Sequence, residues 1–273
     1  MRYGKLILAA IAGGIYLSFM YINPYGGVIP LSEMTLQLCG SRGTFVLGFS
    51  PSELMSFSMC LFPAFLFELY AGIRLYRHFC TASIYVFSRC PRRVKWYLQE
   101  VGRLAGEVCV FQLFLLLSTL LISVIRWELQ VDAAGIVLLL YHFLLQSLWI
   151  YIMALAVNLC AIYLGSSTAY GIVICVQMIC IVLFYLSDQA VRSSEGLSIS
   201  RFLIWNPMAH LVLGWHGSGI KAVNGMLEPQ RMGADLNHSL LLFFVLGSIL
   251  TAAGAYIIKN HELLVSDLER SVA

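Results

Sequence analysis

The sequence predicts an all-α integral membrane protein with six transmembrane helices and both termini in the cytoplasm. Hydrophobic residues make up 60% of the 273 residues and charged residues only 11%, whereas an average soluble domain carries about 25% charged residues. A chain so poor in charge cannot cover a globular surface with polar groups, so lipid must cover it. A basic run from Arg74 to Arg103, which contains a single acid, Glu100, then indicates the orientation.

The spans are predicted from apolar segments, because a helix needs about 20 apolar residues to cross the hydrocarbon. The first segment follows Arg2 and Lys5 and ends without a clear cleavage site, so we interpret it as a retained signal anchor. The fourth is longer than a perpendicular span needs, and a turn at 165–167 separates it from the fifth. We expect one transmembrane domain over 1–273, with spans at about 5–22, 53–73, 104–125, 134–162, 168–187 and 239–258.

The distribution of basic residues sets the predicted topology. With the loop 74–103 in the cytoplasm, 11 Lys and Arg residues lie inside and six outside, in agreement with the positive-inside rule. The segments 23–52, 126–133 and 188–238 are then extracellular. We expect a multi-pass protein of a bacterial plasma membrane.

The cytoplasmic loop predicts an amphipathic helix between the second and third spans. After Pro91, the apolar residues Val94, Leu98 and Val101 follow a helical period, with Trp96 beside them. We expect this helix to lie along the inner membrane surface. It either docks a cytoplasmic partner or serves as a topological anchor that contacts lipid headgroups.

The outer segment 188–238 contains apolar pieces that are too short to cross the membrane. Residues 202–205 and 208–215 are of this kind, and such pieces lie in the interface or enter the membrane and return. Asn206-Pro207 predicts a helix start between them. His210 and His216 are six residues apart without a bracketing carboxylate, so we predict interfacial histidines and no metal site.

Two acids within predicted spans are candidate functional residues. Carboxylates at membrane depth are costly, yet Glu68 and Glu107 both lie within two turns of the basic loop. They either pair with Arg74, Arg77 or Arg103 at the inner interface, or act as a proton or cation relay. The other polar residues within spans are expected to face the bundle and bond to another helix; these are Gln112, Gln146, Asn158 and Gln177.

Several motifs are absent from the sequence. It contains no G-x-x-x-x-G-K-[ST] phosphate-binding loop and no H-E-x-x-H zinc motif. The eight cysteines show no zinc-finger spacing, and most fall in apolar segments or the basic loop, so no disulfide framework is expected. The net charge of +3 reflects the basic loop and does not indicate a nucleic-acid-binding face. We expect no cofactor, no metal and no enzymatic activity on this chain.

The layout resembles the membrane subunit of an ABC transporter of the type 2 exporter class. That family has six spans, cytoplasmic termini, a coupling helix between spans two and three, a tight inner turn after span four, and re-entrant helices between spans five and six. The segment Ser88-Arg89-Cys90-Pro91-Arg92-Arg93 with Trp96 is similar to the family's arginine-containing coupling segment, and Asn206-Pro207 stands where the family often has Asn-Pro. The size and coupling segment are similar to permeases for export of, or immunity to, lantibiotics and other antimicrobial peptides. The loop 23–52 is longer than the family predicts.

The resemblance implies a passive half-transporter. A second permease, identical or a sister subunit, would complete the pathway, and separate ATP-binding subunits would carry ATP and Mg. Coupling would involve Arg89, Arg92, Arg93 and Trp96. Spans two and five usually line the pathway, which makes Ser56, Ser58, Phe62 and Gln177 candidates for contact with an exported peptide or amphiphile.

Two other classes stay open. An ion- or proton-driven transporter would use Glu68 or Glu107 as the relay, although the inverted repeats and broken spans typical of such folds are not evident. A membrane enzyme or a non-transporting sensor subunit is the other, although no nucleophile, base or metal ligands converge in the sequence.

Overall fold

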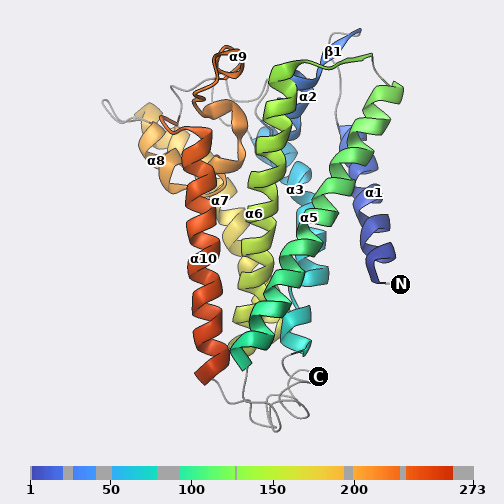
Figure 1. The fold of residues 1–273 in the computed structure, drawn as a ribbon. Helices are drawn as coiled ribbons and strands as arrows, with labels where there is room; N and C mark the ends of the chain where they lie inside the picture. The colour runs from blue at the N-terminus through green and yellow to red at the C-terminus, as the bar shows by residue number, and fades with distance from the viewer. Residues whose placement is uncertain are drawn as a thin grey trace. The chain divides into compact units, whose positions relative to one another are not determined.

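The structure of the chain, a computed structural model, is built from long helices (Figure 1). Six helices in the part of the chain that it describes are long and apolar enough to cross a membrane. They are α1 (Arg2–Met20), α3 (Pro51–Ala71), α5 (Arg93–Arg126), α6 (Ala133–Leu164), α7 (Ser166–Ser193) and α10 (Leu236–Asn260). The all-helical class and the six apolar spans are confirmed. The described residues are 2–20, 27–40, 51–78, 93–126, 128–193, 199–227 and 232–260.

The third helix begins earlier than predicted. Helix α5 runs without a break from Arg93 to Arg126, so the expectation of a separate amphipathic helix before the third span is wrong for residues 93–103. The reason is that these residues contain no proline and only one glycine, Gly102, and one interior glycine costs only about 1 kcal/mol. Leu98, which belongs to the predicted apolar stripe, is also half exposed, whereas the neighbouring Tyr97 is buried.

Short elements connect the long helices. Strand β1 (Ile29–Pro30) pairs in parallel with β2 (Leu129–Gln130), and α2 (Leu31–Leu38) follows β1 directly. Between α7 and α10 lie α8 (Ile199–Trp205), the 3-10 turns η1 (Ala209–Leu211) and η2 (Leu213–Trp215), and α9 (Lys221–Asn224). Gly165 alone separates α6 from α7, with a φ of 79° that favours glycine. The tight turn expected at this point is therefore observed.

The chain divides into two compact units, and several helices contribute to both. The first unit comprises Met1–Pro63, Val110–Ser147 and Gln177–Leu242. Within it, α1 and α5 approach closely at Gly14, where an added Cβ would come within 2.4 Å of the Leu115 carbonyl oxygen. Thr119 strengthens this contact, because its hydroxyl donates to the Gly14 carbonyl over 3.2 Å.

The second unit comprises Ala64–Cys109, Leu148–Val176 and Phe243–Ala273. Helices α5 and α10 meet where the fully buried Tyr97 covers Gly254, and an added Cβ on that glycine would lie 2.0 Å from the Tyr97 hydroxyl oxygen. Helices α6 and α10 are joined by a 2.6 Å hydrogen bond between the hydroxyls of Tyr151 and Thr251. Small residues and hydroxyls at helix contacts are typical of membrane helix packing.

Candidate functional site

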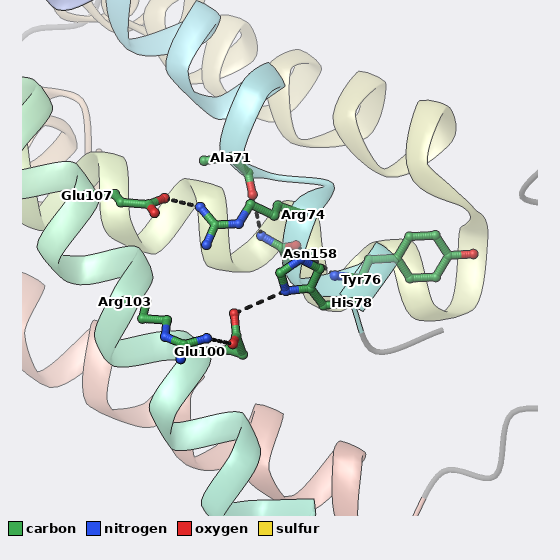
Figure 2. A network of polar contacts seen from close by, with 8 residues as sticks. All are labelled: Ala71, Arg74, Tyr76, His78, Glu100, Arg103, Glu107 and Asn158. Carbon is green, nitrogen blue, oxygen red and sulfur yellow. Dashed lines mark hydrogen bonds and ion pairs between the residues drawn. The ribbon is translucent and has the colours of Figure 1, made fainter. Parts of the chain in front are cut away.

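The candidate site is a polar network in the second unit, at the end of α3 that leads into the basic segment (Figure 2). Helix α3 ends at Ala71, the chain turns at residues 72–73, and a short helical piece follows over 74–78. Gly72 permits this turn, because an added Cβ would lie 2.4 Å from the Glu68 carbonyl oxygen.

Asn158 of α6 bridges the break in the chain. Its Nδ2 donates to the Ala71 carbonyl over 3.1 Å and to the Ala154 carbonyl over 2.8 Å, and its Oδ1 accepts from the Tyr76 amide over 3.1 Å. The side chain is fully buried. A break in a helix deprives backbone groups of their intrahelical partners, and Asn158 supplies partners on both sides of this one. The prediction that Asn158 bonds to another helix is confirmed.

Two buried carboxylates of α5 contact basic side chains from residues 74–78. Arg74 forms an ion pair with Glu107, whose side chain is only 3% exposed. His78 Nδ1 lies 3.3 Å from Glu100 Oε2, and Arg103 forms an ion pair with the other oxygen of Glu100. Figure 2 shows Arg74 and His78 reaching from one segment towards the two acids on α5. Glu107 is expected to pair with Arg74, Arg77 or Arg103, and the observed partner is Arg74.

The spacing of these acids places them on one stripe of α5. Glu100 and Glu107 are seven residues apart, which is two helical turns. Arg93 and Trp96 precede Glu100 by seven and four residues, so they belong to the same stripe. Both are partly exposed. The other two residues of the predicted coupling set, Arg89 and Arg92, lie outside the described residues.

Glu68 and three other polar residues within the spans are buried. Glu68 lies on α3, one turn before Gly72, and its side chain has no exposed surface. Gln112, Gln146 and Gln177 are also buried, as expected for side chains that face the bundle.

The structure does not gather the four pathway candidates into one lining surface. Ser56 is exposed on α3, whereas the Ser58 hydroxyl donates to the carbonyl of Leu54 in its own helix over 2.8 Å. Phe62 is half exposed, with its ring 5.7 Å from that of Tyr16. Gln177 is buried in α7.

The segment between α8 and α10 is packed into the first unit. Asn206 Nδ2 donates to the Cys180 carbonyl of α7 over 2.6 Å, and its Oδ1 accepts from the Met208 amide over 3.0 Å. Asn206 therefore caps a turn as predicted, although a 3-10 turn follows and not an α-helix. Trp215 packs edge-on against Phe184 of α7, with ring centroids 5.6 Å apart.

His210 and His216 are both buried in this segment, and their position at the membrane interface stays a prediction. Both rings contact the hydroxyl of Ser239 in the first turn of α10. Sequence reasoning missed this cluster because the serine lies 29 and 23 residues further along the chain. No spacing rule links them.

A second set of contacts within the first unit joins the segments that lead into α2 and α6. Asp132 accepts the amides of Ser32 and Gly135 over 3.0 and 3.1 Å, which ties the start of α2 to the start of α6. Burial, the largest single influence, raises the pKa of Asp132, but the hydrogen bonds that the carboxylate accepts together outweigh it, so the net shift is downward. Cys39 Sγ lies 3.0 Å from His142 Nδ1. Burial raises the pKa of the Cys39 thiol, which therefore stays neutral.

No group of three or more His, Cys, Asp or Glu side chains in the described part of the chain could hold a metal ion. Six of the eight cysteines are described, and all six are free thiols. Comparison of the chain with protein-family models, with curated proteins and with solved structures found no match.

Proposed function

We propose that this protein is the membrane subunit of an ATP-driven ABC transporter of the type 2 exporter class. The chain forms part of the substrate pathway, and a separate ATP-binding subunit carries ATP and Mg. A second permease, identical or a sister subunit, completes the pathway for a peptide or an amphiphilic compound. The protein resides in a bacterial plasma membrane with both termini in the cytoplasm.

One observation carries the proposal: the basic segment between α3 and α5 is held at both ends by the polar network. Residues 79–92 connect the piece 74–78 to the start of α5, and those two flanks are joined by the contacts of Arg74 with Glu107 and of His78 with Glu100. A force applied to residues 79–92 would therefore act on both spans together. A coupling segment needs this property.

The position of Arg93 and Trp96 extends the reasoning. They lie in the first turn of α5, on the stripe that contains Glu100 and Glu107. A nucleotide-dependent displacement of Arg93 would be transmitted along α5 to Glu100 and Glu107, which lie about two and four turns further along the helix. Breaking a buried ion pair strongly destabilises a protein. A displacement of this stripe would therefore have to move α5 and the piece 74–78 together, as one body.

The connection between α7 and α10 supports re-entrant helices. Asn206 bonds to the carbonyl of Cys180, which lies seven residues before Ser187, the last residue of the apolar span. At 1.5 Å per residue, Asn206 would lie about 10 Å inside a membrane whose boundary is at Ser187. Irregular backbone at such a depth must be buried in protein, and residues 208–216 are buried throughout. Trp205 is 87% exposed, as suits a side chain at the membrane interface.

The proposal is tested by charge reversal on the first turn of α5. The native complex is purified with its ATP-binding subunit, and substrate-stimulated ATP hydrolysis is measured for the wild type, Arg93→Glu and Trp96→Ala. Both variants are expected to assemble with lower stimulated turnover, because the turn that receives the push is altered while the ion pairs of Glu100 and Glu107 are retained.

Lys95→Glu is the matched control. Lys95 is exposed, carries the same charge and lies two residues from Arg93, about 200° around the helix. Its reversal is expected to leave stimulated turnover near the wild-type value. Normal turnover in Arg93→Glu, or transport by the purified protein after ATP depletion, would contradict the proposal. The second outcome would instead favour an ion-driven transporter.

A further inference from the structure

Three buried side chains in the first unit converge on one oxygen. Ser239 Oγ lies 2.7 Å from His210 Nδ1 and 2.7 Å from His216 Nε2. The ring centroids are 6.1 Å apart, and none of the three residues is more than 1% exposed. The serine belongs to α10 and the histidines to the segment between α8 and α9, so the cluster joins two parts of the chain.

The outer nitrogens of both rings face carbonyl oxygens. His210 Nε2 lies 3.0 Å from the Ile204 carbonyl, and His216 Nδ1 lies 3.0 Å from the Val212 carbonyl. A carbonyl only accepts hydrogen bonds, so each of these nitrogens must carry a hydrogen. In a neutral imidazole the other nitrogen is then an acceptor. Both inner nitrogens therefore present lone pairs to the same serine oxygen.

When both rings are neutral, the cluster has one hydrogen fewer than its hydrogen bonds require. The two contacts to Ser239 Oγ need two hydrogens, but the hydroxyl has only one to donate. With both rings neutral, one contact places a nitrogen lone pair against an oxygen lone pair at 2.7 Å. With one ring protonated, that ring donates to Oγ, and the hydroxyl donates to the other ring. Every polar atom then has a partner.

We propose that His210, His216 and Ser239 form a binding site for a single proton, which the two imidazoles share through the serine hydroxyl. The proton completes the hydrogen bonds that hold residues 206–216 against α10, and its loss forces one ring away from the serine. This proposal is independent of whether an ATP-binding subunit docks on the basic segment.

The surroundings oppose protonation and so set its pH range. Burial lowers the pKa of both histidines, and electrostatic repulsion from the exposed His238 lowers both further. Repulsion from His210 also lowers the pKa of His216, which is about 4. The carbonyls on the outer nitrogens act in the opposite direction. Asp235, at the start of α10, is exposed, and the side chains of Asp188, Arg192 and Arg201 lie outside the described residues. Proton uptake is therefore expected between pH 4 and the ordinary histidine value of about 6.5.

The test is a ¹⁵N NMR titration of the full chain, with labelled histidine, in lipid nanodiscs from about pH 7.5 to about pH 3. Ring-nitrogen shifts separate N–H, bare nitrogen and imidazolium. One proton is expected for the pair of rings, shared between them, while the outer N–H of each ring persists at every pH. Two independent protonations, or none while the protein stays folded, would overturn the proposal.

Variants separate the shared proton from simple burial. Ser239→Ala keeps both rings but removes the shared oxygen, so the midpoint is expected to fall by about one pH unit as the charged ring loses its hydrogen bond. Ser239→Thr retains the hydroxyl and is expected to restore the midpoint. His238→Gln removes a repulsive charge and is expected to raise it. A midpoint in Ser239→Ala equal to that of the wild type, with the His78 signal unchanged as a check of the fold, would refute the shared proton.

Discussion

Asn158→Ala tests how the end of α3 is held. The substitution deprives the Ala71 carbonyl and the Tyr76 amide of hydrogen-bond partners at a buried site. A buried polar group that loses its partner costs about 1–3 kcal/mol, but hydrogen bonds between membrane helices average about 0.6 kcal/mol because the unfolded state finds other partners. Since both groups flank a helix break, we expect a loss of about 1–3 kcal/mol in the free energy of unfolding.

The assay is reversible unfolding in mixed micelles, followed by tryptophan fluorescence. Ser147→Ala is the matched control, because Ser147 lies on the same helix and is buried, yet its hydroxyl has no hydrogen-bond partner within the described part of the chain. We expect that control to be neutral or slightly stabilising. Equal stability of the two variants would refute the role given to Asn158.

Two further predictions concern packing and pH. Gly254→Ala is expected to destabilise the protein by about 1–3 kcal/mol through its clash with Tyr97. Tyr97→Phe should partly restore stability, since the tyrosine hydroxyl makes no hydrogen bond within the described residues. A double mutant no more stable than Gly254→Ala would contradict this contact. Asp132→Asn is expected to lower stability at pH 7, because the pKa of Asp132 is lowered in the folded state. That difference should begin to shrink as the pH falls below about 4, the ordinary pKa that Asp132 has in the unfolded chain, and should disappear only below the lowered pKa of the folded state, where the wild-type carboxylate also becomes protonated. A difference that does not shrink as the pH is lowered would exclude the proposed cause.

The six spans could be predicted from sequence because apolar length is a local property. Hydropathy located the six apolar helices. It missed the start of α5 at Arg93, because hydropathy falls where charged residues occur even though the helix continues through the basic run. Of the polar groups, Glu107 could be assigned in advance to Arg74, Arg77 or Arg103, but only the structure selects Arg74 among them.

The rest of the candidate sites depends on contacts between distant parts of the chain. Asn158 reaches Ala71 across 87 positions, and Cys39 reaches His142 across 103. The two-residue pairing of β1 with β2 is too short for any sequence period to reveal. Helix packing creates these neighbours, so they become visible only in three dimensions.

The central claim is that the basic segment between α3 and α5 receives a separate ATP-binding subunit. The most direct measurement is purification of the protein from its native host in mild detergent, with mass spectrometry of every chain that accompanies it. The account predicts a companion that carries a phosphate-binding loop and is lost when Arg93 and its basic neighbours are reversed in charge. A protein that purifies alone and remains fully active in liposomes without ATP would contradict it.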